Sequence, residues 1–380
     1  MKVGMLISIV LARPDAAGGI RSSTVASSQG GSPRAAASAL CSSILPNLIA
    51  AQQFQELADF ARTCDDGRPR VVRSLIRHGL DFGFRPEDAE ASLSGVRFLS
   101  DVARPLDLQT PIENHAALEA ADFLRRTAAK DTHWSAGAEA EDALVNLTAT
   151  WAAMDGAAGA KLLEGLSAEL AEGDVAGGRS AVRVLSRLLA DTRLAEALGA
   201  LSDAVTGARD GGVRALAGQR LADVLALNFL DEASAQRGVN ALRTSALNDA
   251  DLLARDQSSS ALARLAGVLR HADGGKELAS ACIAALRDVG LRGQTAKDQK
   301  LAAERIFALA SSAFADEAGE YIAALAAILK EGSADPSGVV GMLAMLAREL
   351  RHERADLAAR CISALEDGAL RGESVAHRQA

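Results

Sequence analysis

A segment of this chain occurs twice in nearly the same form: CIAALRDVGLRG at residues 282–293 and CISALEDGALRG at residues 361–372. The two copies start 79 residues apart, which is about twice 40. Self-similarity at a fixed period of this length is typical of arrays in which one small structural unit stacks on the next. The repeat therefore predicts a linear stack of units, in which each unit contacts only its neighbours.

Two interleaved series of large apolar residues carry the period through the second half of the chain. We call these residues anchors, and apolar residues recur around them at intervals of three and four, as in 262–269 and 343–350. This spacing is that of a buried helical face. The first series consists of Leu201, Leu242, Leu286, Leu325 and Leu365, which are spaced by 41, 44, 39 and 40 residues. The second series consists of Leu185, Leu225, Leu265, Ile306 and Leu346, which are spaced by 40, 40, 41 and 40 residues. Each unit is thus predicted to be two amphipathic helices, one for each anchor.

The two series resemble HEAT/armadillo-type repeats, whose units are helix pairs of roughly 40–47 residues. The resemblance covers residues 137–372, although the proline turn of the fuller HEAT signature is absent. It implies an all-α fold: an α-solenoid of about 40-residue helix-pair repeats, with five or six pairs wound into a right-handed superhelix.

The composition agrees with such a stack. Hydrophobic residues make up 49% of the chain but aromatic residues only 3%, with one Tyr and two Trp. Alanine and leucine must therefore fill the core, which suits helices packed closely in thin layers. Alanine is also the strongest helix former, and no segment shows the alternation of a half-buried strand.

The chain divides by composition into four parts. Residues 1–34 are rich in Ser and Gly, and Asp15 is the only acidic residue before Glu56, so we expect a disordered leader. Residues 35–136 are predicted to form an irregular helical cap, with helix starts marked by Thr110-Pro111 and Arg85-Pro86. The repeat region follows at residues 137–372, and residues 373–380 are predicted to be a disordered tail.

Four interpretations of the leader remain open. It is similar to the Ser-rich, uncleaved leaders of bacterial type III secreted effectors, and it also fits a cleaved signal peptide, an organellar transit peptide or an inert tail. The apolar run 3–12 is too short to span a bilayer, so no stable membrane insertion is expected. The expected location is outside the producing cell, inside a host cell if export follows the type III route, and otherwise the cytoplasm.

The net charge of −8, with a sequence pI of about 5.4, argues against nucleic acid as a partner. A solenoid that grips DNA needs a basic stripe to neutralise phosphates, whereas the acidic excess here lies within the repeat region. The exception is the arginine-rich stretch 68–77, which is either a solvated helix face or a basic dock for an acidic partner or a membrane surface.

No pattern of residues points to catalysis, a cofactor or a metal. The four cysteines show neither C-x-x-C pairs nor zinc-ligand spacing, and the six histidines form no pair at helical spacing. Cys282 and Cys361 occupy equivalent places two units apart, too far for a disulfide, and we expect both to be buried in the core. The chain is therefore predicted not to be an enzyme.

The predicted function is a non-enzymatic scaffold that binds a protein partner along the solenoid surface, as a secreted bacterial effector would. The candidate partner-binding residues follow the first-series anchors by one or two places, so stacking should align them in what we call the charged ladder. It consists of Asp203, Arg243, Arg287, Asp288, Glu366 and Asp367. The competing interpretation is that these are ordinary solvent-facing helix charges.

Two other classes of function stay open at this point. One is a helical structural or regulatory component of a secretion apparatus, although the regular 40-residue period argues against it. The other is an enzyme whose site lies in the irregular helical segment 35–132.

Overall fold

The structure, a computed structural model, describes residues 76, 89–104, 111–129, 134–154, 156–192, 195–227, 230–272, 274–312, 318–331 and 336–379. The chain divides into two compact units, Met1–Asn47 and Leu48–Ala380, and every described residue belongs to the second. The predicted leader at 1–34 and the helix starts at Arg85-Pro86 and Thr110 lie outside the described residues, as does the arginine-rich stretch 68–77 apart from the buried Ile76.

The described residues form fourteen helices and no strand, and the helices alternate between two rows. The odd-numbered row consists of α5 (Ala89–Ala103), α7 (Trp134–Met154), α9 (Val175–Thr192), α11 (Gly211–Leu225), α13 (Leu252–Leu269), α15 (Ala296–Ser312) and α17 (Pro336–Leu350). The even-numbered row consists of α6 (Pro111–Ala129), α8 (Gly156–Glu172), α10 (Ala195–Gly207), α12 (Glu232–Asn248), α14 (Lys276–Arg292), α16 (Ala318–Glu331) and α18 (Ala355–Gln379).

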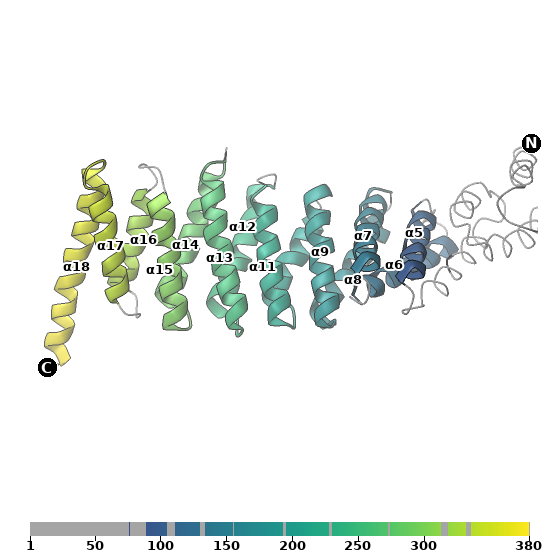
Figure 1. The fold of residues 1–380 in the computed structure, drawn as a ribbon, viewed down its shortest axis with the longest axis horizontal. Helices are drawn as coiled ribbons and strands as arrows, with labels where there is room; N and C mark the ends of the chain where they lie inside the picture. Colours follow the sequence, from purple (N-terminus) through teal and green to yellow (C-terminus); the bar gives the residue numbers. More distant parts are fainter. Residues whose placement is uncertain are drawn as a thin grey trace, which may run out of the picture. The chain divides into compact units, whose positions relative to one another are not determined.

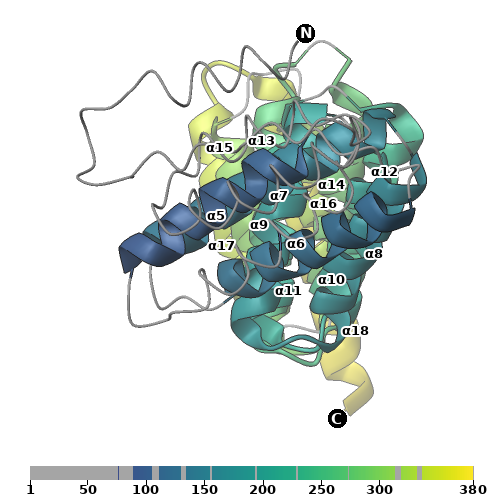
Figure 2. The same ribbon diagram turned by 90° about the vertical axis from the view of Figure 1, so that its right-hand side faces the viewer.

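Each helix packs on its neighbours in the chain and on the next helix of its own row. Thus α13 contacts α12 and α14 as well as α11 and α15, and the same holds along the rest of the two rows. Figure 1 shows the pairs following one another from α5 and α6 to α17 and α18, and in Figure 2 the odd-numbered helices lie to the left and the even-numbered ones to the right. The described chain is therefore an α-solenoid, as the sequence predicted.

Nine of the ten predicted anchors lie in the core between the two rows. Those nine are at most 2% exposed: Leu185, Leu201, Leu225, Leu242, Leu265, Leu286, Ile306, Leu325 and Leu346. The tenth, Leu365 on α18, is partly exposed. The six pairs from α7 to α18 match the predicted number of repeats, and α5 and α6 continue the same alternation toward the amino terminus.

Both repeat-region cysteines are free thiols with no exposed surface, which confirms their predicted place in the core. Burial raises the pKa of the Cys282 thiol to about 12 and that of Cys361 to about 11, because a thiolate would lose its hydration. Both groups are therefore protonated and unreactive at neutral pH.

Polar side chains mark where several helices begin. Asp210, Asp231 and Asp251 accept hydrogen bonds from backbone N–H groups in the first turns of α11, α12 and α13. These caps satisfy donors that a helix start leaves without an intrahelical partner. At the other end of the chain, α18 continues to Gln379, so residues 373–379 are helical where a disordered tail was predicted.

Candidate functional site

A repeated polar clamp closes the turns from the even-numbered row to the odd-numbered row. The fourth residues of α11, α13 and α15 are Arg214, Arg255 and Gln299. Each donates a hydrogen bond to the carbonyl of the residue that directly follows the preceding helix, over 2.6, 2.8 and 3.0 Å respectively. The carboxyl end of a helix leaves carbonyl groups unsatisfied and carries partial negative charge, so a cation or amide donor is stabilising there.

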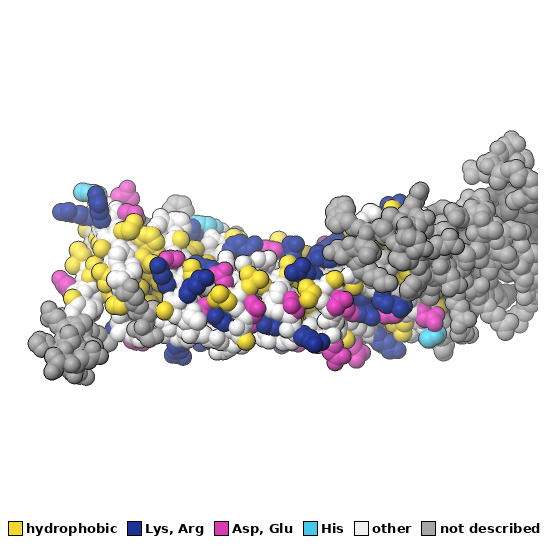
Figure 3. Space-filling view, turned by 60° about the horizontal axis from the view of Figure 1, so that its bottom comes forward, with side chains coloured by type: hydrophobic (Ala, Val, Ile, Leu, Met, Phe, Trp, Pro, Cys, Tyr) yellow, Lys and Arg dark blue, Asp and Glu magenta, His cyan; other side chains and the backbone are white. Residues whose placement is uncertain are grey.

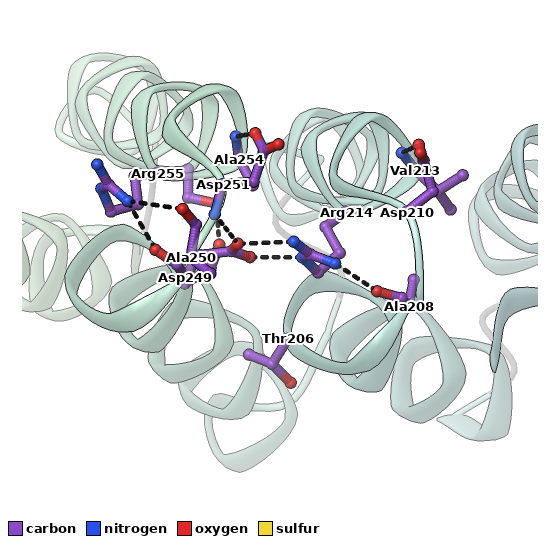
Figure 4. A network of polar contacts seen from close by, with 12 residues as sticks. Thr206, Ala208, Asp210, Val213, Arg214, Asp249, Ala250, Asp251, Ala254 and Arg255 are labelled. Atoms are coloured by element: carbon purple, nitrogen blue, oxygen red, sulfur yellow. Dashed lines mark hydrogen bonds and ion pairs between the residues drawn. The ribbon is translucent and has the colours of Figure 1, made fainter. Parts of the chain in front are cut away.

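Arg214 also reaches the next repeat. Its guanidinium group donates two hydrogen bonds to Asp249, over 2.6 and 2.8 Å, and Asp249 accepts a third from the backbone N–H of Asp251. The hydrogen bond to Asp249 raises the pKa of Arg214 above its ordinary value. Figure 4 shows this group lying between the turn before α11 and the turn before α13.

Arg255 repeats the arrangement one unit further on, but deeper in the molecule. It pairs with Asp298 over 3.0 Å, and the two side chains are 6% and 4% exposed. Asp298 also accepts hydrogen bonds from the backbone and hydroxyl of Thr295 at the start of α15. The clamps therefore link three successive turns and fix the spacing of the repeats, and their burial makes them a support for the surface rather than a part of it.

The structure separates the six residues of the charged ladder into three places. Arg243 on α12 and Arg287 on α14 both contact the Asp288 carboxylate, over 2.5 and 3.7 Å. Asp203 lies exposed on α10, and Glu366 and Asp367 lie exposed on α18. Between α14 and α18 the ladder is interrupted, because the equivalent residues of α16 are the alanines at 326 and 327.

Asp288 differs from the expectation for a surface charge, because the residue is only 8% exposed. It lies beneath two guanidinium groups, whose side chains are 43% and 44% exposed. Two cations share one anion, so this part of the even-numbered row carries excess positive charge. Along the row the exposed charge is thus negative on α10, positive on α12 and α14, and negative on α18.

A hollow of about 430 Å³, which the sequence did not indicate, lies between α6, α7 and α8. Its floor is apolar and includes Leu144, Leu162 and Leu166, and its rim carries charges of both signs. Arg125 on the rim forms ion pairs with Asp122 and Glu169. The residues of this rim with a charged side chain are Asp122, Arg125, Lys161, Glu169 and Glu172.

One residue of α8 bears on the hollow. Gly165, which lines it, has no neighbouring atom from outside its own helix backbone within 4 Å of where a side chain would begin, so this helix leaves space on that side. In the sequence, a glycine inside a predicted helix is the one signal that could have pointed to this space.

Within the described ranges, no group of His, Cys, Asp or Glu side chains is arranged to hold a metal ion. None of the helices in these ranges combines the length and the apolar character needed to cross a bilayer.

No protein-family model and no curated protein sequence matches the chain. Among solved structures it is similar to an engineered protein, with 18% identity over 83% of this chain and 98% of that one and a TM-score of 0.27. It is also similar to importin beta, with 13% identity over 83% of this chain and a TM-score of 0.34, and it spans 43% of the importin beta chain. A microtubule polymerase with tumor overexpressed gene (TOG) domain arrays matches with 13% identity over 83% of this chain and 80% of that one, at a TM-score of 0.32. The assignment as an α-solenoid rests on the two rows of helices in this chain and not on these similarities.

Proposed function

We propose that this chain is a non-enzymatic scaffold that binds a partner protein along its even-numbered row of helices. The observation that carries the proposal is the order of exposed charge on that row: Asp203 on α10, the Arg243–Arg287 pair on α12 and α14, and the two acids Glu366 and Asp367 in the middle of α18. A partner that fits this order presents basic, acidic and again basic groups along its length. Complementary charge of this kind guides encounter and fixes register.

The turn clamps make the surface suitable for such recognition. Because Arg214–Asp249 and Arg255–Asp298 tie neighbouring repeats together, the distances between exposed charges on successive helices are set before a partner arrives. A preorganised surface loses less conformational entropy on binding than a flexible one. Contacts spread over several repeats can then add up, even though each exposed charge contributes little.

The test compares two double charge reversals in the full chain, each with no change in net charge. Asp203→Arg with Arg287→Glu alters the even-numbered row, and Asp191→Arg with Lys300→Glu alters exposed residues of α9 and α15 in the odd-numbered row. After a partner has been identified by cross-linking to the full chain, its affinity is measured by calorimetry at low and at physiological salt. We expect the even-row variant to bind at least about tenfold more weakly at low salt, with a smaller loss at higher salt because screening shortens the range of exposed charges.

The odd-row variant should bind like the unmodified chain. Equal affinities for all three proteins, or an equal loss in both variants, would place the interface elsewhere. Asp288 is left unchanged in this design because its burial would confuse a loss of binding with a loss of stability.

We further propose that the scaffold acts outside the cell that makes it, as a secreted effector. The support is the composition of residues 1–34, which is rich in Ser and Gly and nearly free of acids. These residues lie outside the described part of the structure. Deleting them should abolish type III-dependent export in a reporter assay, while the helical circular dichroism and melting temperature of the remaining chain stay unchanged. Continued export of the shortened chain would contradict the proposal.

A further inference from the structure

On α18, the last described helix, one side is exposed that is covered in the four preceding even-numbered helices. Ile362 lies three residues before the anchor of α18. The residues at this position in the four preceding even-numbered helices are at most 3% exposed: Leu198, Val239, Ile283 and Ile322. Ile362, by contrast, is 50% exposed, and the anchor Leu365 is partly exposed as well. In the interior of the stack the next helix of the same row packs over this side.

The neighbouring helix α17 contributes more apolar surface. Val340 is 41% exposed and Met345 53%, and Gly341 and Ala344 between them are also exposed. Figure 3 shows hydrophobic side chains gathered over this end of the row. An exposed apolar surface of this kind is typical of a site that another molecule covers.

Charged residues of opposite sign lie at the two ends of this face. Four-residue spacing places Arg348 on the same side of α17 as Val340 and Ala344, and places Glu366 on the same side of α18 as Ile362. A short turn at residues 351–354 joins the two helices, so they run antiparallel. Arg348, near the end of α17, therefore lies beside the start of α18, and Glu366 lies about three turns further along, toward the start of α17.

We propose that a second copy of this chain covers the face, related to the first by a two-fold axis through the apolar centre. A rotation of 180° exchanges the two ends, so Arg348 of one protomer meets the partner's Glu366 and Glu366 meets the partner's Arg348. Ile362, which lies near the middle of this span, then packs against the same residue of the other copy. A two-fold interface uses the same patch on both protomers and must be complementary to itself. An apolar centre with one basic end and one acidic end meets that requirement.

The first measurement is the mass of the full chain in solution, by light scattering and sedimentation equilibrium over a roughly hundredfold range of concentration. We expect a dimer that dissociates on dilution. Ile362→Glu should convert it to a monomer with an unchanged circular dichroism spectrum, because half of this residue's surface is exposed without the partner. As a matched control, Leu253→Glu on α13, where the replaced side chain is 51% exposed, should leave the mass unchanged.

The second measurement tests the two-fold pairing. Arg348→Glu and Glu366→Arg should each weaken the dimer at least about tenfold, since each variant brings like charges together at both ends. An equimolar mixture of the two variants should form a heterodimer. In that heterodimer the carboxylate introduced on α17 of one copy meets the guanidinium group introduced on α18 of the other, while the unaltered pair remains at the opposite end.

A chain that stays monomeric over the whole concentration range would overturn the proposal. The proposal would also be overturned if this face bound a different protein and the chain did not associate with itself. A dimer whose variants fail to combine when mixed would also overturn it. A dimer that survives Ile362→Glu would place the interface on another surface.

Discussion

The interior of the stack, represented by α11 to α14, and its end at α17 and α18 have the same sequence pattern and a different environment. Leu286 and Leu365 are equivalent anchors, yet Leu286 has no exposed surface and Leu365 is partly exposed. The pattern determines which side of each helix is apolar, because helical periodicity is a local property of the chain. Whether that side is buried depends on a neighbour, and α18 has neighbours on one side only among the described helices.

The polar clamps show the same difference. Arg214, Arg255 and Gln299 hold the turns before α11, α13 and α15, whereas the fourth residue of α17 is Val339, which has no side-chain donor. The end pair is therefore joined to the stack by apolar packing without this hydrogen bond. Stability in a linear array is a sum of local terms, so the end should open before the interior does.

The largest expected effect comes from placing a charge at the two equivalent anchors. Leu286→Asp should destabilise the chain by at least about 3–5 kcal/mol, because an unpaired carboxylate would be buried between the rows. Leu365→Asp should cost less than about 2 kcal/mol, because its site is partly hydrated. Urea unfolding gives the free energies, and hydrogen exchange should show a loss of protection across the interior for the first variant and only near α17 and α18 for the second. Equal global unfolding by both variants would contradict the linear array.

Removing a buried clamp should cost nearly as much. Arg255→Ala leaves the buried Asp298 carboxylate without its cation and removes the side-chain donor to the carbonyl of Asp249, and we expect a loss of about 3–5 kcal/mol. The matched control is Arg264→Ala, which removes an exposed cross-repeat ion pair with Asp223 and should cost less than about 1 kcal/mol. Chemical denaturation of both variants decides the point, and similar losses would mean that Arg255 does not support the repeats as described.

Two glycines should respond to alanine in opposite directions. A Cβ at Gly290 would lie 2.4 Å from the buried side chain of Ile328 on α16, so Gly290→Ala should destabilise the interior by about 1–3 kcal/mol. A Cβ at Gly341 on α17 meets nothing within 4 Å, and Gly341→Ala should stabilise the end by about 0.5–1 kcal/mol through helix propensity. Thermal unfolding distinguishes the two, and a loss of stability at Gly341 would show that the end face is already filled.

The smallest effect concerns the two buried thiols at alkaline pH. An unfolded thiol ionises near pH 8.5, whereas the folded Cys282 thiol has a pKa of about 12. Because the folded pKa is raised, the folded state keeps a proton that the unfolded state releases. The free energy of unfolding therefore falls as the pH rises from the unfolded pKa through the folded pKa of about 12. Cys282→Ala should therefore make the free energy of unfolding less dependent on pH in this range. Cys361→Ala should have the same effect to a smaller extent, because the folded Cys361 thiol has a pKa of about 11.

A labelling experiment on the same thiols compares the two regions directly, with Cys41 and Cys64 replaced by Ser. A thiol reagent at pH 8 should modify Cys361 before Cys282, since the end pair opens locally more often than the interior. Faster labelling of Cys282 would place the weaker part of the stack in the interior.

The sequence by itself predicted the helix pairs, their period and nearly all of the buried anchors. It also placed Cys282 and Cys361 in the core. These features follow from spacing within single helices and from repetition along the chain, which are local and can be counted. The charged ladder stays a prediction as a binding surface: its residues on α10, α14 and α18 are exposed except for Asp288, and the row is interrupted at α16.

Only the tertiary structure decided the partners of the charged groups. Arg214 pairs with Asp249 and Arg255 with Asp298, across 35 and 43 residues, and the place that these arginines share, four residues after a capping aspartate, does not identify their partners. The hollow beside α8, the burial of Asp288 and the exposure of Ile362 have the same origin. Periodicity determines the direction in which a side chain points, whereas its burial and its ion-pair partner depend on what a distant part of the chain places there.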